Sequence, residues 1–157
     1  MEEKPTQEMI DHWQRWFAVE CNNLAWDLAS KDVRTEQDTQ RMVYAAYSAA
    51  FHWSAVGQPV NNARADVTLA HVLALYGQGD QAMFYARRSL EYFEKHPATD
   101  WDTAFALAEV SFAAYVQGDA ASHQQYYNKA RLSGEAIVDP EDRRIFMAEL
   151  GRIPAPE

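Results

Sequence analysis

Apolar residues recur at helical spacing along nearly the whole chain. In residues 6–30 they return every three or four positions, which places them on one face of a helix. Residues 60–76 repeat the pattern at Leu69, Val72 and Tyr76. No stretch alternates apolar and polar residues with an excess of β-branched types, so no strand is predicted. The pattern therefore predicts an all-α protein.

Turn residues divide this pattern into about seven helices. Gly57, Gly77 and Gly118 each follow a periodic segment, where glycine commonly ends a helix, and Asp and Thr residues suited to N-caps follow. The first five predicted helices are residues 6–30, 35–56, 60–76, 80–95 and 99–117, and Asp80 is the expected cap of the fourth. A sixth helix is expected after its cap Asp119, and a short seventh after its cap Asp139. Short connections predict antiparallel hairpins. Residues 1–150 are expected to form one domain, followed by a flexible tail at 151–157.

The second predicted helix is apolar around most of its circumference. Its sequence, RMVYAAYSAAFHWSAV, contains few polar residues. A helix that is apolar on all sides is generally covered by neighbours. This segment is therefore expected to occupy a central position in the fold.

Two stretches of the chain share one turn pattern. YGQGDQAMFYARRSLEY begins at Tyr76, and YVQGDAASHQQYYNKARL begins at Tyr115. Each runs from an aromatic residue through Gln-Gly-Asp into a second helical pattern. Aligning Gly77 with Gly118, 41 residues later, also aligns Tyr85 with Tyr126. The repetition predicts two helical hairpins of similar construction.

These hairpins resemble the tetratricopeptide repeat, a 34-residue unit with small residues along its second helix after a glycine-containing turn. The residues that carry the resemblance are Leu69, Ala70, Gly77, Ala82, Ala86 and Ser89 in the first unit, and Gly118, Tyr127 and Ala130 in the second. Three features depart from the family pattern. The interval is 41 residues, His123 occupies a position where the family has a small residue, and the Trp of the family is missing from the first helix of both units. The resemblance covers residues 60–136 and implies a stack of hairpins, with a non-repeating helical bundle as the alternative.

A concave groove follows from this resemblance, because the first helices of successive hairpins line such a surface in tetratricopeptide-like stacks. The residues expected to face it are Arg64, Val67, His71 and Ala74, joined by Phe105, Phe112 and Tyr115. Mixed aromatic and arginine character suits a peptide site, although the three aromatic residues could equally belong to the core. The favoured function is a non-catalytic protein-protein interaction module that binds a peptide or partner helix.

The competing hypothesis is a helical-bundle enzyme or ligand-binding protein with a polar pocket. Glu20 and Asn23 lie three positions apart on the first helix, and they could meet His52, Arg64 and His71. Arg64 and His71 also resemble the Arg-x6-His pattern of HEPN-type ribonucleases, in which the two residues act on the scissile phosphate. Ordinary polar contacts between helices are the alternative explanation for the same residues.

Charge and composition narrow the choice of partners. The net charge of −9 disfavours nucleic acid and anionic membranes. The single cysteine, Cys21, excludes an intrachain disulfide and a Cys-based metal site. No Glu-x-x-His motif or phosphate-binding loop is present, so neither a metal nor a cofactor is expected.

The ends of the chain bear on location and assembly. The polar, acidic first residues do not form a signal peptide and no apolar run could span a bilayer, so a cytoplasmic protein is expected.

The segments WFAVECNNLAW and FHWSAVGQPVNNARAD are similar to a group of small bacterial helical proteins, a resemblance that implies no particular activity. A short hairpin stack has exposed ends. A homodimer could therefore form through Trp13, Trp16 or the seventh helix.

Overall fold

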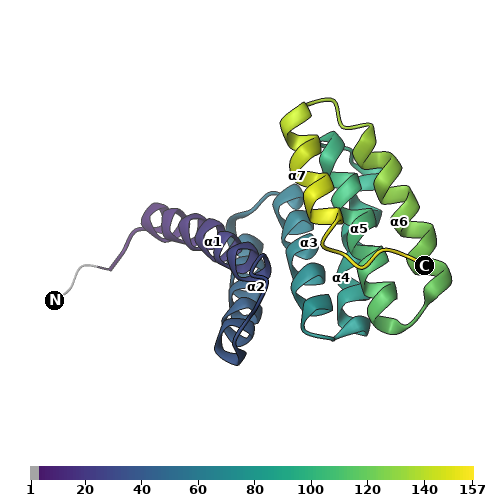
Figure 1. The fold of residues 1–157 in the computed structure, drawn as a ribbon. Helices are drawn as coiled ribbons and strands as arrows, with labels where there is room; N and C mark the ends of the chain where they lie inside the picture. Colours follow the sequence, from purple (N-terminus) through teal and green to yellow (C-terminus); the bar gives the residue numbers. More distant parts are fainter. Residues whose placement is uncertain (1–3) are drawn as a thin grey trace.

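Residues 4–157, which the computed structural model describes, form seven helices and no strand (Figure 1). The helices are α1 (Gln7–Ala29), α2 (Glu36–Val56), α3 (Pro59–Leu75), α4 (Gly79–Lys95), α5 (Asp100–Gln117), α6 (Ala120–Glu135) and α7 (Pro140–Leu150). Each helix packs against the next, and α3 and α5 also pack against each other across the hairpins. The predicted all-α stack of hairpins is confirmed.

The two glycine turns are built alike. Gly77 and Gly118 have φ values of +81° and +78°, a region that glycine enters without steric cost. After each glycine, the next N–H bonds back to a carbonyl five residues earlier: Gln78 to Leu73 at 2.8 Å, and Asp119 to Ala114 at 2.9 Å. These bonds satisfy carbonyls left free at the helix ends.

The predicted cap of the fourth helix is wrong, although that of the sixth is confirmed. Asp119 caps α6 by accepting the N–H of Ser122 at 3.0 Å. Helix α4 begins at Gly79, one residue before Asp80, whose carboxylate instead accepts a hydrogen bond from the side chain of Gln117 at 2.8 Å. Asp80 therefore ties α4 to the end of α5.

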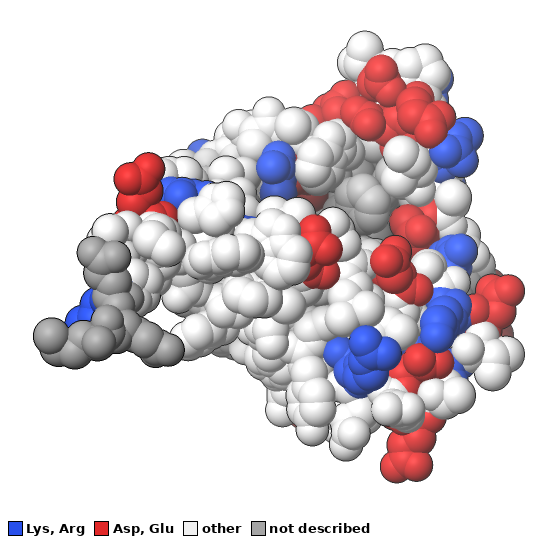
Figure 2. Space-filling model, turned by 90° about the vertical axis from the view of Figure 1, so that its left-hand side faces the viewer, with Lys and Arg blue, Asp and Glu red and all other residues white. Residues whose placement is uncertain are grey.

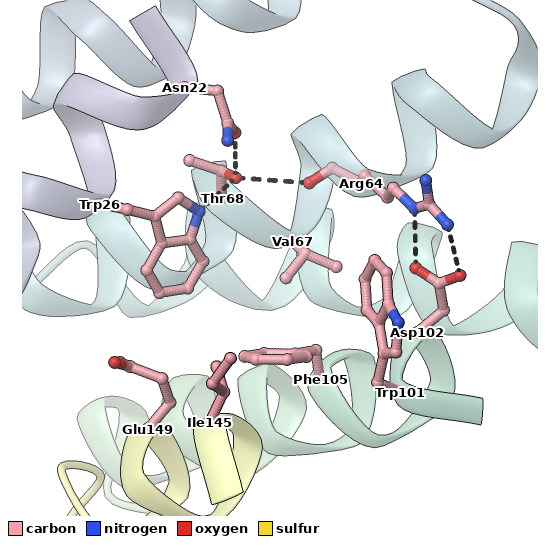
Figure 3. A pocket seen from close by; sticks show the side chains of 10 residues that line it. All are labelled: Asn22, Trp26, Arg64, Val67, Thr68, Trp101, Asp102, Phe105, Ile145 and Glu149. Carbon is pink, nitrogen blue, oxygen red and sulfur yellow. Dashed lines mark hydrogen bonds and ion pairs between the residues drawn. The ribbon is translucent and has the colours of Figure 1, made fainter. Parts of the chain in front are cut away.

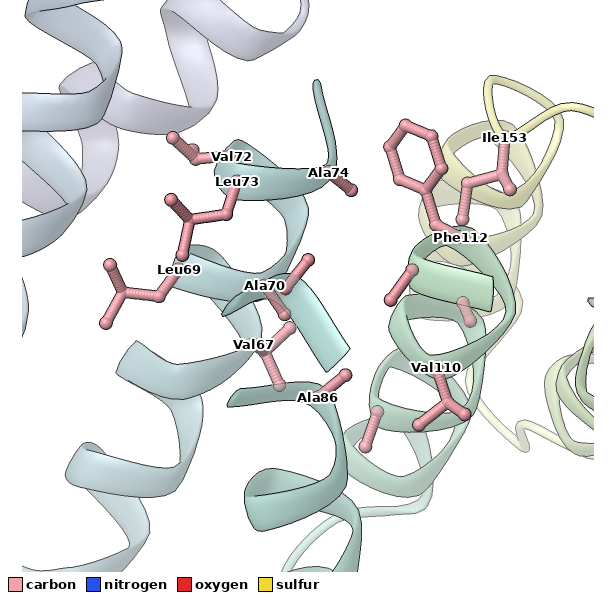
Figure 4. Close-up of a cluster of buried hydrophobic side chains, with 14 of the residues drawn as sticks. Val67, Leu69, Ala70, Val72, Leu73, Ala74, Ala86, Val110, Phe112 and Ile153 are labelled. Atoms are coloured by element: carbon pink, nitrogen blue, oxygen red, sulfur yellow. The ribbon is translucent and has the colours of Figure 1, made fainter. Parts of the chain in front are cut away.

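The centre of the fold is formed by α3 and α5, not by α2. Figure 4 shows core side chains on both sides of α3: Leu69, Val72 and Leu73 point away from α5, Ala70 and Ala74 lie on the side of α5, and Ile153 lies beside Phe112 of α5. Helix α2 buries a narrow face that includes Ala45, Ala46 and Ala49, while Tyr44 and Phe51 are exposed. Small side chains let α2 approach its neighbours closely, so its large aromatic residues remain on the opposite face.

Helix α7 closes the C-terminal end of the stack through one close contact. The ring of Phe146 is fully buried against Gly134 of α6, where an added Cβ would lie 2.2 Å from a ring carbon. The following residues are not helical, yet the side chain of Ile153 is buried and Arg152 donates to the carbonyl oxygen of Ser30 at 2.6 Å. The first part of the predicted tail is thereby fixed to the end of α1.

Candidate functional site

The first helices of the hairpins, together with α7, surround a half-open cavity of about 360 Å³. Its lining residues are Asn22 and Trp26 on α1, Arg64, Val67 and Thr68 on α3, Trp101, Asp102 and Phe105 on α5, and Ile145 and Glu149 on α7 (Figure 3). Seen from the side of α1, the surface is hollowed and largely uncharged, with acidic side chains gathered at its upper edge (Figure 2). We call this cavity the A-helix groove, because the first helix of each hairpin, which we call its A helix, contributes to the lining.

The wall of the groove is aromatic. Phe105 meets Trp26 and Trp101 edge to face, with ring centroids 6.3 Å apart in both pairs. Trp26 also stacks on the ring of His71 at 4.6 Å, on the side of the core. Edge-to-face contacts hold such rings in place, so the groove offers a fixed apolar surface.

A bidentate ion pair forms one end of the groove. The Nε and Nη2 atoms of Arg64 each lie 2.9 Å from an oxygen of the Asp102 carboxylate, and the guanidinium lies 4.7 Å from the ring centre of Trp101. The hydrogen bond to Asp102 raises the pKa of Arg64 although burial opposes this. Asp102 is 1% exposed and also accepts the N–H and O–H of Thr99 at the start of α5. The charge of Arg64 is therefore compensated within the protein.

A second polar group joins α1 to α3 beside the aromatic wall. Thr68 accepts the indole N–H of Trp26 at 3.0 Å and donates its hydroxyl proton to the Oδ1 atom of Asn22 at 2.7 Å. Only the second of these bonds uses the Asn22 oxygen, and among residues 4–157 the amide nitrogen of Asn22 has no hydrogen-bond acceptor. Asn22 can therefore donate to a molecule in the groove.

His71, which was expected to face a groove, does not line this cavity. It is 5% exposed and its Nδ1 atom lies 3.0 Å from Oε1 of Glu109, which is 2% exposed. Burial alone would lower the pKa of His71, but the charge and hydrogen bond of Glu109 raise it above the ordinary value of 6.5. Glu149 acts in the same direction and Arg34 against it. The pair joins α3 to α5 behind the aromatic wall.

This pair should make stability depend on pH. Because the folded pKa of His71 is raised, its contribution is complete below about pH 6.5 and is lost as the pH rises through the folded pKa. The free energy of unfolding of the wild type should therefore fall, relative to that of His71→Gln, as the pH rises above about 6.5. Urea unfolding at several pH values measures this difference. A constant difference across the range would contradict the assignment.

The other predicted groove residues are scattered. Val67 lines the groove, whereas Ala74 is buried and Phe112 packs in the core 5.6 Å from the ring of His71. Tyr115 lies on a separate cavity near the end of the chain. Of the residues expected to face a groove, Arg64, Val67 and the core-or-groove candidate Phe105 line this cavity.

The five residues of the predicted polar pocket do not converge. Glu20 is exposed, and Asn23 shares a smaller cavity of about 180 Å³ with Arg64. His52 bonds to Gln14 and stacks on Phe17 at 5.5 Å. His71 is held by Glu109 in the core. These placements provide no single cavity that all five side chains line.

Arg64 and His71 are also not arranged to act on one phosphate. Each pairs with a carboxylate of α5, and both partners, Asp102 and Glu109, lie 38 residues further along the chain. Sequence reasoning missed these partners. The shared separation of 38 residues, close to the repeat interval, is the signal that could have found them.

Within 4–157, no three His, Cys, Asp or Glu side chains are grouped so as to hold a metal ion. None of the helices that the structure describes has both the length and the apolar character required to cross a membrane. Comparison with protein-family models, curated proteins and solved structures finds no match to this chain.

Proposed function

We propose that this protein is a non-catalytic interaction module, similar in design to tetratricopeptide stacks, that binds a peptide in the A-helix groove. The expected peptide has a large apolar side chain next to a lysine or arginine. The observation that supports this most directly is that one cavity is lined by all four of α1, α3, α5 and α7. A ligand there would contact every hairpin of the stack.

The size and lining of the groove suit an apolar anchor. About 360 Å³ lies within the range of small-ligand sites and accommodates one or two side chains. Phe105 and Trp26 supply a fixed aromatic surface, and Ile145 of α7 lies beside Phe105 and across from Trp26 (Figure 3). The amide of Asn22 is free to donate to a peptide carbonyl. A few placed polar groups around an apolar surface are typical of specific sites.

Charge favours a basic residue beside that anchor. Arg64 is neutralised by Asp102, whereas the Glu149 carboxylate lines the groove and has one distant ion-pair partner, Arg152, at 3.8 Å. The whole chain carries a net charge of −9. Such a field attracts cationic partners and raises their rate of association.

A selection from a random peptide library displayed on phage tests this proposal. The wild type should enrich peptides with an aromatic or aliphatic residue adjacent to Lys or Arg. Glu149→Lys should reduce the affinity for a selected peptide by about tenfold, because it replaces attraction by repulsion. Ile145→Glu should reduce it further by placing a charge on the apolar side of the groove.

Glu141→Lys provides a matched control, since this carboxylate lies on α7 but does not line the groove. The control should bind the selected peptides nearly as well as the wild type. Failure to enrich any peptide, or enrichment that Ile145→Glu and Glu149→Lys leave unchanged, would refute the proposed groove.

A further inference from the structure

The first half of α1 carries an exposed row of large apolar side chains. Met9, Ile10, Trp13, Trp16 and Phe17 are respectively 51%, 38%, 51%, 47% and 42% exposed. Their spacing of three and four residues places them along one side of the helix. We call these five residues the N-terminal stripe. It lies away from the A-helix groove, none of whose lining residues it includes.

The rings of the stripe support one another. Trp13 and Trp16 meet edge to face at 5.9 Å, Trp16 and Phe17 at 5.0 Å, and Phe17 stacks on His52 of α2 at 5.5 Å. The hydrogen bond between His52 and Gln14 fixes the last ring of this series. Rings held in this way lose little conformational freedom when a partner covers them.

The stripe occupies half of a helix face whose other half is polar. Continuing along the same side of α1, the exposed residues are Glu20, Asn23 and Asp27. The end of a helical stack normally carries a polar outer face, because no further repeat covers it. The polar half of α1 fits this rule, while the stripe has the character of a surface that another helix covers.

We propose that the stripe is the interface of a homodimer in which α1 packs antiparallel against α1 of a second copy, with the two-fold axis near Trp13. Antiparallel packing lays one apolar half over the other. It leaves Glu20, Asn23 and Asp27 of each protomer beyond the end of the partner stripe, in contact with water. A parallel arrangement would force these three polar residues of the two copies together.

The exposed area is sufficient for such a contact. A large apolar side chain has an accessible surface of about 150–250 Å² when fully exposed. The five half-exposed residues of the stripe therefore contribute roughly 500 Å² of apolar surface on each protomer. A symmetric interface would then bury roughly 1,000 Å², the lower bound for a specific protein-protein interface. A two-fold contact between identical patches is also the commonest form of assembly among soluble oligomers.

The effect of salt on binding distinguishes a second copy of the chain from a basic protein as the occupant of the stripe. Each protomer carries a net charge of −9, so two copies repel each other at long range. The stripe itself contains no charged residue. Salt that screens the repulsion should therefore strengthen the dimer, whereas it would weaken a complex with a cationic partner. This dependence on salt is specific to the proposed occupant.

Sedimentation velocity of the full 157-residue chain, over a range of protein and salt concentrations, tests the proposal. The wild type should sediment as a dimer of twice 17.9 kDa at high concentration, and more completely at 0.5 M than at 0.05 M salt. Trp13→Glu and Trp16→Glu should each raise the dissociation constant about a hundredfold or more, since every substitution occurs twice in the interface. Both residues are half-exposed, so the variants should fold.

Tyr44→Glu is the matched control, because Tyr44 is an aromatic residue of α2 that is 62% exposed and outside the stripe. It should dimerise as the wild type does. A wild type that stays monomeric, a dimer that both Trp variants retain, or a dimer that dissociates in salt would each overturn the proposal. Binding of the monomer to phosphatidylcholine vesicles through the stripe would also overturn it, by assigning this surface to lipid.

Discussion

Replacing Glu109 with alanine should destabilise the protein by about 3–5 kcal/mol at pH 6. The carboxylate is 2% exposed and lies 3.0 Å from the Nδ1 atom of His71, which is itself buried. Because Glu109 raises the pKa of His71, its removal leaves a histidine that must either lose its proton or remain charged without a partner. Urea unfolding followed by circular dichroism measures the change.

Two further variants make this result specific to the buried pair. Glu91→Ala removes an exposed carboxylate that pairs with Lys95 on the surface of α4, and it should change stability by less than about 0.5 kcal/mol. The double variant His71→Phe/Glu109→Leu removes both polar groups and should be more stable than Glu109→Ala. A loss below about 1 kcal/mol for Glu109→Ala would show that the pair contributes little to the packing of α3 against α5.

Replacing Phe146 with alanine should cost about 3–5 kcal/mol, as is usual for a fully buried phenylalanine. Its ring packs on Gly134 of α6 and meets Phe105 of α5 edge to face at 5.0 Å. Loosening of α7 should also weaken peptide binding, because Ile145 and Glu149 line the groove. Thermal unfolding and a peptide titration measure the two effects.

The contact between Phe146 and Gly134 can be isolated by a double-mutant cycle. Gly134→Ala alone should cost about 1–3 kcal/mol, since its Cβ would lie 2.2 Å from the Phe146 ring. In the Phe146→Ala background the same methyl group has room, so its cost should largely disappear. Strictly additive effects would contradict the packing of α7 on α6. The exposed Phe84→Ala serves as the control, with an expected change within about 0.5 kcal/mol.

The helices could be predicted because their signals are local. The apolar period of the first helix and the glycines at Gly77 and Gly118 act within a few residues, and the structure bears out both. The assignment of α2 to the centre failed because composition does not show which side of a helix packs. The alanine-rich side of α2 is buried, while Tyr44 and Phe51 are exposed. Position in a stack depends on neighbours that a single segment does not specify.

The helices that line the cavity follow from the sequence more directly than its individual residues do. Arg64 and Val67, which the resemblance leads one to expect in a groove, line this cavity, since the resemblance specifies which helices face inward. His71 does not line it, because its orientation depends on a carboxylate 38 residues away on another helix. His71 is buried beside Glu109 because residues of two different helices pair with each other. Helical periodicity within one segment does not show which residues of different helices will pair.

The five tryptophans permit the most direct test of the groove. Trp26 and Trp101 line it, whereas Trp13 and Trp16 belong to the N-terminal stripe and Trp53 lines the smaller neighbouring cavity. Two-dimensional nitrogen-15 spectra should show the indole N–H signals of Trp26 and Trp101 shifting as a selected peptide is added. The signals of Trp13 and Trp16 should remain in place. Shifts confined to Trp13 and Trp16, with Trp26 and Trp101 unchanged, would place the peptide elsewhere and contradict the account.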